Sequence, residues 1–494
     1  MNPIGLLLIP LLTALLILLA GRPQQVRWIA LAGAVLQLGA AILLYAAYIN
    51  GDGTGGPMRL EYRAEWYPDW NIGIHTGVDG ISIAMILLTT LVVIAGVLVS
   101  WKMEKLPNTF FFLLTLLALG AYGFFISLDL FSMFFFLEIA VIPKFLLIGI
   151  WGSGRKEYSA NKLALMLMGA SALILVAMMA IYFTAPVGMR TFDMIDIVST
   201  GIPAEAQRFI FPLMFVGFGV FTALFPFHTW VPDGHSSAPT AGSMFLAGIS
   251  MKLGGYGCLR AATWLMPEGA REYGTAIVVI SAVAIIYGAF ATMMQKDLKY
   301  LNAYSSVSHC GFVLLGIGLL TKTAITGAVL QMVSHGLMTA LFFAVIGMIY
   351  ERTHTRQLDE LGGLMKVMPF VSTVMFIAGL SSLGLPGLSG FVAEMTIFVG
   401  GWERVSPVYR VSTILAAMSI VVTAVYVLRA IGRTVMGPIT KTEYLTLTDA
   451  GWHERLAAIV LIAGILAMGI APGWIVELIT PGAQAITERI GSLP

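Results

Sequence analysis

Long apolar segments follow one another along almost the whole chain, with only short polar stretches between them. Roughly 20 apolar residues in a helix are enough to cross the hydrocarbon core of a bilayer, which is about 30 Å thick. The pattern therefore predicts an all-α membrane protein with about 14 transmembrane helices. The predicted spans are 3–20, 27–49, 77–101, 108–126, 129–151, 161–184, 208–231, 238–265, 273–294, 299–320, 323–350, 366–402, 408–436 and 453–478.

Two of these spans contain residues that interrupt a helix. The twelfth, 366–402, would be about 55 Å long as one straight helix, and it contains Leu385-Pro386-Gly387 near its middle. The seventh contains Pro226 close to its end. Because proline removes a backbone donor and clashes with the preceding turn, we predict that helices 7 and 12 are discontinuous, with breaks at Pro226 and Pro386.

The two broken spans occupy matching positions in two sets of five. Spans 4–8 (residues 108–265) and spans 9–13 (residues 273–436) each have the broken helix fourth, and a five-span unit inverts when it is repeated. Broken helices at matching positions of inverted repeats indicate a transport site. Outside the repeats, residues 1–107 hold three helices and an external loop at 50–76, and residues 437–494 hold helix 14 and a tail.

Basic residues set the expected orientation of these spans. Loops on one side of the predicted bundle carry sixteen Lys and Arg residues, among them Lys299, whereas the opposite side carries nine. The more basic side usually faces the cytoplasm. We therefore expect a multi-pass protein of the bacterial inner (cytoplasmic) membrane with both termini in the periplasm. The net charge of +2 gives no reason to expect a nucleic-acid partner.

A few charged residues fall inside the predicted spans. Glu138, Lys144, Lys252 and Glu394 lie well within them, and Arg260 lies near a span end, from which it could extend to the interface. Each charge at the centre of a spanning helix costs about 2.5–3.5 kcal/mol. Two explanations stay open: an ion pair that fixes helix packing, or a proton relay. Because buried ion pairs seldom add net stability, we favour the relay.

Histidines extend this set of polar residues. His309 and His335 lie in spans 10 and 11, where each could be a relay or a hydrogen-bonded core residue. His228, Asp233 and His235 cluster where span 7 ends, on the side expected to be cytoplasmic. This cluster is a candidate for proton uptake or simply a cap and turn, and it indicates metal binding only weakly.

Motifs for cofactors are not found in the sequence. Neither a phosphate-binding loop nor a dinucleotide fingerprint is present, and Cys258 and Cys310 lack the spacing of a metal or iron–sulfur site. We expect buried, reduced thiols, no cofactor, no metal and no redox site in this chain.

Three segments carry a specific resemblance to a known family. They read PFHTWVPDGHSSAPTAG at 226–242, LAGISMK at 246–252 and DLKYLNAYSSVSH at 297–309. These segments resemble the antiporter-like, proton-translocating subunits of respiratory complex I, and within that family the group called chain M, the counterpart of mitochondrial subunit 4. The resemblance extends over nearly the whole chain.

This resemblance implies a membrane-arm subunit of NADH:quinone oxidoreductase that moves protons without a redox centre of its own. Flavin, iron–sulfur clusters and quinone would belong to partner subunits, and the other antiporter-like chains, L and N, would be neighbours in the bilayer. Glu138 would match the glutamate of helix 5, Lys252 the lysine of helix 8 and Glu394 the polar residue of helix 12. His309 and His335 would lie on the central hydrophilic axis.

One position departs from the family pattern. The family usually has a lysine in helix 7, seven residues before the histidine that is His228 here, and this chain has Phe221. It has Lys144 in span 5, where an apolar residue is expected. Lys144 lies about 9 Å along the helix and roughly 120° around it from Glu138. We therefore expect Lys144 to reach toward span 7, and our hypothesis is that it replaces the missing lysine.

Two other functions stay open at this point. The family resembles subunits of multi-subunit cation/proton antiporters and of membrane-bound hydrogenases, so the chain could belong to one of those complexes. The loss of the helix 7 lysine also permits a structural spacer in the membrane arm that no longer pumps.

Overall fold

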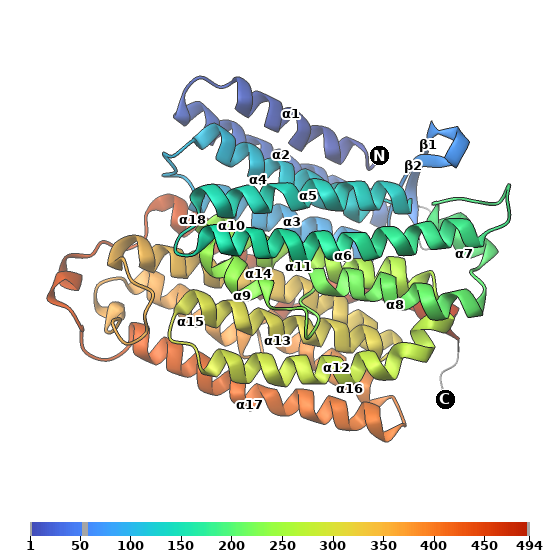
Figure 1. Cartoon of the computed structure of the whole chain (residues 1–494). Helices are drawn as coiled ribbons and strands as arrows, with labels where there is room; N and C mark the ends of the chain where they lie inside the picture. The colour runs from blue at the N-terminus through green and yellow to red at the C-terminus, as the bar shows by residue number, and fades with distance from the viewer. Residues whose placement is uncertain (1, 52–57, 492–494) are drawn as a thin grey trace.

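The computed structural model describes residues 2–51 and 58–491, and helices running alongside one another make up most of them (Figure 1). The first half contains α1 (Gly5–Leu19), α2 (Pro23–Ile49), α3 (Gly80–Val99), α4 (Pro107–Ile126), α5 (Leu130–Trp151), α6 (Lys156–Thr184), α7 (Met194–Thr200), α8 (Ala204–Phe221), α9 (Trp230–Ser237), α10 (Thr240–Phe245) and α11 (Met251–Gly257). The second half contains α12 (Pro267–Met293), α13 (Leu298–Gly318), α14 (Lys322–Thr353), α15 (Pro369–Ser382), α16 (Ser389–Trp402), α17 (Pro407–Val435), α18 (Trp452–Ile470) and α19 (Gly473–Ile490).

The membrane character of the fold is confirmed. Within the described residues, ten helices are long and apolar enough to cross a bilayer: α2, α3, α4, α5, α6, α8, α12, α14, α17 and α18. The other predicted spans coincide with α1, with the helical stretch that begins at α10, with α13 and with the α15–α16 pair. The prediction of an all-helical bundle is therefore correct except for one small sheet.

Both predicted helix breaks are present. Helix α8 ends at Phe221 and α9 begins at Trp230, with Pro226 between them. Helix α15 ends at Ser382 and α16 begins at Ser389, with Pro386 between them. In the second break, Gly384 and Gly387 adopt φ values of +73° and +90°, which residues with a side chain rarely adopt. Glycine therefore makes this break in the helix possible.

The helical stretch that follows α9 is not a regular α-helix. It alternates α10, a π-helical segment (Leu246–Ser250), α11 and a second π-helical segment (Cys258–Trp264). Insertions of this kind are rare, and they are frequent at functional sites. The apolar pattern alone did not predict them, because π and α segments bury similar sets of residues.

Two segments differ from the prediction. The predicted external loop 50–76 contains β1 (Arg59–Tyr67), which pairs antiparallel with β2 (Ile72–Val78); residues 52–57 of that loop lie outside the described residues. The last predicted span, 453–478, is two helices, α18 and α19, because Pro472 stands between them and cannot continue the hydrogen-bond ladder.

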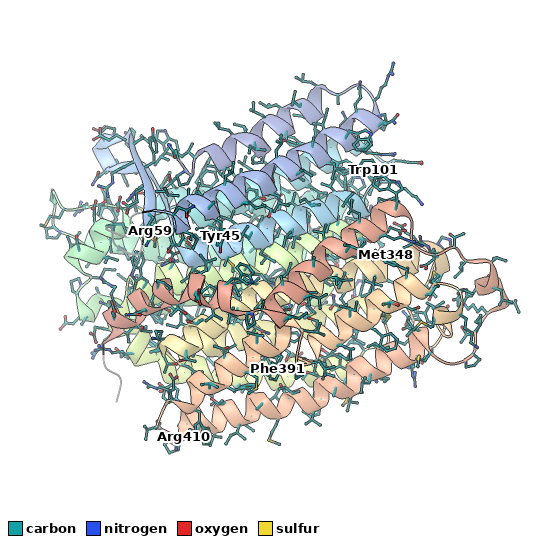
Figure 2. All side chains as sticks on the ribbon, turned by 180° about the vertical axis from the view of Figure 1, so that it is seen from behind. Tyr45, Arg59, Trp101, Met348, Phe391 and Arg410 are labelled. Carbon is teal, nitrogen blue, oxygen red and sulfur yellow. The ribbon has the colours of Figure 1, made fainter. Side chains whose placement is uncertain are left out.

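Burial divides the helices into a centre and a periphery. All of the most apolar stretch of α14 and 89% of that of α3 are buried, whereas the corresponding share is 39% in α2, α6, α17 and α18. Side chains project from the outer helices all around the bundle (Figure 2). Both ends of the chain lie at the same end of the bundle as the β1–β2 hairpin (Figure 1). Polar residues on α14 are thus enclosed by the other helices.

Candidate functional site

Lys252 lies on α11, between the two π-helical segments. Its side chain is 1% exposed. Its Nζ donates to the carbonyl of Ala247, in the first π-helical segment, and lies 2.8 Å from Nδ1 of His335 on α14. The predicted central lysine is therefore in direct contact with one of the predicted histidines.

The contacts continue from His335 to an acidic residue. The rings of His335 and His309, on α13, stack with centroids 5.4 Å apart. Nδ1 of His309 lies 3.5 Å from a carboxylate oxygen of Glu394 on α16. These three residues are at most 4% exposed. Four helices thus bring Lys252, His335, His309 and Glu394 together in one buried row, which we call the central row.

The break between α15 and α16 encloses the acidic end of the central row. Ser382, at the end of α15, lies with its hydroxyl oxygen 3.1 Å from Nε2 of His309. A Cβ added to Gly384 would lie 2.8 Å from a carboxylate oxygen of Glu394. The broken helix therefore places its free end directly against the last two groups of the row.

Glu138 and Lys144 form a second site on α5. Ser171 of α6 donates a hydrogen bond to Glu138, which is half-buried and not enclosed as the sequence suggested. The Lys144 side chain is 1% exposed, and its Nζ has no hydrogen-bond partner among the described residues. That Nζ lies 5.6 Å from the ring centroid of Phe221, the last residue of α8. Lys144 thus reaches toward span 7, as expected.

The three residues of the candidate uptake cluster, His228, Asp233 and His235, have different contacts in the structure. Asp233 forms an ion pair with Lys162 at 2.7 Å, and the ring of His228 stacks on that of Phe225. His235 is fully buried, and neither of its ring nitrogens has a partner in the described part of the chain. No group of three or more His, Cys, Asp or Glu residues within residues 2–51 and 58–491 is arranged to hold a metal ion.

Lys299 is buried in the structure, although its place in the sequence predicted a loop residue. Asp297 caps α13 by accepting a hydrogen bond from the Lys299 amide at 2.8 Å, so the helix begins one residue before the lysine. The Lys299 Nζ donates to the carbonyl of Ala238 at 2.6 Å. Lys252 and Lys299 are the charged groups that act on His235. An Asp cap marks the start of the helix in the sequence, but it does not indicate that Lys299 is buried.

Arg260 is the second correction. Its place near a span end allowed it to extend to the interface, but its side chain is 1% exposed and forms an ion pair with the fully buried Asp79. Asp79 also caps α3 by accepting from the Ser82 amide at 2.9 Å. The partner lies 181 residues away along the chain, so helix periodicity could not reveal it.

A cluster of titratable groups attaches the hairpin to the bundle. Asp193 precedes α7 and accepts from Arg63 at 2.6 Å, and it lies 2.7 Å from Nδ1 of His75. Burial alone would lower the pKa of His75, but the hydrogen bond and charge of Asp193 outweigh it and raise that pKa. Burial raises the pKa of Asp129, which precedes α5, to about 7. We call His75, Asp129 and Asp193 the hairpin cluster.

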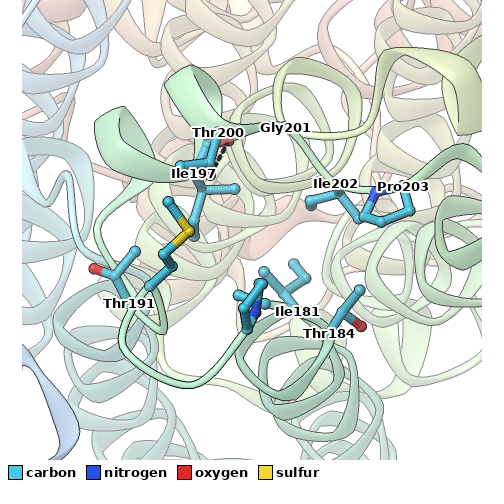
Figure 3. A pocket seen from close by; sticks show the side chains of 11 residues that line it. Ile181, Thr184, Thr191, Ile197, Thr200, Gly201, Ile202 and Pro203 are labelled. Atoms are coloured by element: carbon cyan, nitrogen blue, oxygen red, sulfur yellow. Dashed lines mark hydrogen bonds between the residues drawn. The ribbon is translucent and has the colours of Figure 1, made fainter.

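A cavity of about 330 Å³ lies elsewhere, between the ends of α6, α7 and α8. Figure 3 shows its lining, which includes Ile181, Ile197 and Ile202 and is mainly apolar. None of the residues of the central row lines it. The titratable groups therefore form a packed row through the bundle, apart from this cavity.

Proteins of known name are similar to this chain over nearly its whole length. NAD(P)H-quinone oxidoreductase chain 4 1 of Microcystis aeruginosa is 35% identical, and the alignment covers 99% of this chain and 93% of that protein. The protein of that name from Synechococcus sp. (strain JA-2-3B'a(2-13)) is 37% identical, with coverage of 99% and 93%. These names agree with the prediction of the chain M group, the counterpart of subunit 4.

Solved structures agree with these relatives. A chain of respiratory complex I from Thermus thermophilus matches with a TM-score of 0.90 and 26% identity, over 99% of this chain and 100% of that one. A chain of the Mrp complex from Dietzia sp. DQ12-45-1b has the same fold, with a TM-score of 0.86 at 20% identity over 98% and 97%. The family described as NADH:quinone oxidoreductase/Mrp antiporter, TM matches residues 127–423. This protein therefore belongs to the NADH:quinone oxidoreductase/Mrp antiporter family.

Proposed function

We propose that this chain is the chain 4 (chain M) subunit of the membrane arm of an NADH:quinone oxidoreductase. It translocates protons from the cytoplasm to the periplasm, and the driving force comes from quinone reduction in other subunits. The observation that carries this proposal is the central row, in which Lys252 and His335 lie 2.8 Å apart without access to solvent. Placing titratable side chains inside the bilayer costs free energy. Proton exchange explains why the groups of the central row are nevertheless buried, because each of them can gain and lose a proton.

The row suggests an order of proton transfers. Lys252 is the central carrier, and it passes a proton to Nδ1 of His335 across the 2.8 Å contact. Donor and acceptor atoms must approach within about 3 Å for transfer. The ring centroids of His335 and His309 are 5.4 Å apart, so this transfer requires movement of a ring or a bridging water. His309 then delivers the proton to Glu394, from which it leaves toward the periplasm.

Uptake from the cytoplasm reaches Lys252 through His235 and Lys299. The charges of both lysines act on the buried ring of His235. His228 and Asp233 lie further out, where Asp233 is already neutralised by Lys162. We assign the inner part of the uptake path to His235 and Lys299 and the outer part to buried His228 and half-buried Asp233.

The architecture we propose has fourteen membrane crossings and two inverted five-helix repeats, residues 108–265 and 273–436. The breaks after Phe221 and Ser382, which come at matching places in the two sets, support it. Both termini and the hairpin would face the periplasm in a bacterial inner membrane. Chains L and N would be the neighbouring subunits, and flavin, iron–sulfur clusters and quinone would be held by partner chains.

A reconstituted complex tests this function. In sealed proteoliposomes, replacing Lys252 with Met should lower the number of protons moved per electron, whereas Lys252→Arg, which keeps a cation, should retain more of it. Quinone reduction measured with an uncoupler reports whether assembly and electron transfer are intact. An unchanged proton-to-electron ratio in Lys252→Met would favour the non-pumping spacer.

The alternative complexes are distinguished by co-purification. A cation/proton antiporter or a membrane-bound hydrogenase would place this chain beside other antiporter or hydrogenase subunits. The identity of 35–37% to chain 4 proteins over nearly the whole chain favours the oxidoreductase. We expect NADH-binding and iron–sulfur chains to co-purify with a tagged form of this subunit.

A further inference from the structure

The unpaired ammonium of Lys144 is a costly feature that packing alone does not explain. Its side chain is 1% exposed, and no hydrogen-bond acceptor in the described part of the chain lies within reach of its Nζ. A methionine or leucine would fill the same space without removing a charge from water. The group therefore calls for a role that requires a charge or an exchangeable proton.

The surroundings of this ammonium favour a cation. Its Nζ lies over the ring of Phe221 at 5.6 Å, within the range of a cation–π contact. Phe221 ends α8, and the C-terminus of a helix is the partially negative end of its dipole, although three of the last four carbonyls of α8 accept hydrogen bonds here. Glu138, on the same helix as Lys144, is the charged group that acts on it. Three separate features thus attract positive charge to this point.

The same helix end is in close contact with the helix that carries Lys252. Gly254 follows Lys252 by two residues, and a Cβ added to it would lie 2.5 Å from the carbonyl oxygen of Phe218 and 2.3 Å from Oγ1 of Thr222. The backbones of α11 and α8 therefore touch directly at the last turn of α8. Lys144 on α5 and the helix that carries Lys252, α11, therefore both contact the last turn of α8.

We propose that Lys144 is a second proton-carrying lysine of this chain, which exchanges protons with Lys252 across the broken end of α8. The inference rests on the proposed function. In the transfer step, the Lys144 ammonium loses one proton and becomes an amine, while the Lys252 amine gains it and becomes an ammonium. An ionised Glu138 holds the proton on Lys144, and neutralisation of Glu138 releases it.

A charge-relocation experiment tests this assignment in the whole complex. The Lys144→Met variant should lower the proton-to-electron ratio in proteoliposomes to the level of Lys252→Met. Adding Phe221→Lys to Lys144→Met should restore part of the ratio, because it places an amine at the same helix end from the other side of the contact. Lys144→Met with Phe221→Met is the matched control, and it should restore nothing.

The outcomes separate this inference from the proposed function. A normal ratio in Lys144→Met beside a reduced one in Lys252→Met would overturn the role of Lys144 and leave the function intact. Normal ratios in both variants would overturn the function itself. Equal restoration by Phe221→Lys and Phe221→Met, or none by either, would also overturn the inference, because the charge at this helix end would then not matter. Lys144→Gln, which keeps a polar side chain, replaces Lys144→Met if the complex fails to assemble.

Discussion

His335 occupies the middle of the central row and can receive a proton on one ring nitrogen and release it from the other. Its Nδ1 faces Lys252 at 2.8 Å, and its Nε2 has no partner within the residues that the structure describes. A neutral imidazole with one accepting and one donating nitrogen is suited to such a relay. The free nitrogen is thus available to the next group in the row.

Replacing His335 with Phe should therefore interrupt pumping while leaving a ring in the same space. We expect the proton-to-electron ratio to fall and the uncoupled rate of quinone reduction to stay near that of the parent complex. His453→Phe is the matched control, because His453 is also buried but bonds to the carbonyl of Leu98 on another part of the bundle. Equal losses in the two variants would point to packing and not to proton transfer.

Single residues also mark the limits of prediction from sequence. Lys252, His309, His335 and Glu394 could be singled out because charged and imidazole groups stand out in apolar spans. Lys299 and Arg260 were misplaced because each lies near a predicted span end, where the exposed and buried alternatives have the same local pattern. Their partners, Ala238 and Asp79, are 61 and 181 residues away, so only the tertiary structure could assign them.

At the scale of elements, prolines and glycines allowed the interrupted helices to be predicted. Pro226 and Pro386 lie within the observed breaks. The hairpin and the split between α18 and α19 were missed, because their segments are short and the apolar pattern runs through them. The π-helical segments beside Lys252 carry no comparable signal, since they shift the hydrogen-bond register without changing which residues are apolar.

The break between α15 and α16 should tolerate replacement of Gly387 better than replacement of Gly384. Gly384 and Gly387 both have positive φ, so alanine at either position should cost about 1–3 kcal/mol of local strain. At Gly384 the new methyl group would also meet Glu394 at 2.8 Å, whereas at Gly387 it would meet open space. Proton pumping should therefore fall more in Gly384→Ala than in Gly387→Ala. Equal effects in proteoliposomes would show that contact with Glu394 does not matter.

The contacts that attach the β1–β2 hairpin to the bundle should weaken as the pH rises. The raised pKa values of His75 and Asp129 mean that the folded state favours the protonated forms, so their stabilisation is lost as the pH rises through those values. Burial would raise the pKa of Asp193, but the His75 hydrogen bond lowers it, so its contribution is lost only in acid. Hydrogen exchange of residues 59–78, corrected for its intrinsic rate, should accelerate from about pH 4 to about pH 7 as Asp129 ionises, and further above about pH 6.5 as His75 loses its proton.

A His75→Gln variant provides the control for this pH dependence. Glutamine keeps a polar side chain but does not titrate, so the acceleration above about pH 7 should be weaker in this variant. An identical pH profile in parent and variant would show that His75 does not hold the hairpin. Exchange in the buried helix α14 serves as the internal reference, because its central stretch is fully enclosed.

At the scale of the whole molecule, the two most buried helices, α14 and α3, are surrounded by helices with apolar outer faces. α14 is enclosed and supplies His335, while α2, α6, α17 and α18 present most of their apolar stretches outward. Such an arrangement keeps the central row away from both lipid and water. The family and the bundle could be predicted from the chain, but which helices are central could not, because α2 and α4 have the same mean hydropathy of 2.1 although 39% and 83% of their apolar stretches are buried.

The proposed orientation can be measured by labelling single cysteines. Glu65, in the hairpin, and Gln24, at the start of α2, are both exposed, and the native Cys258 and Cys310 are buried. A membrane-impermeant thiol reagent should label Glu65→Cys from the periplasmic side and Gln24→Cys from the cytoplasmic side. The reverse pattern would invert the proposed direction of transport relative to the fold.

The most direct test of the central claim is a double variant in the central row. If Lys252 and His335 act in one connected path, Lys252→Met and His335→Phe should each lower the proton-to-electron ratio, and the double variant should lower it no further than the single variants do. Additive losses would show that the two residues act independently. Unchanged ratios in the single variants would contradict proton transfer along the row altogether.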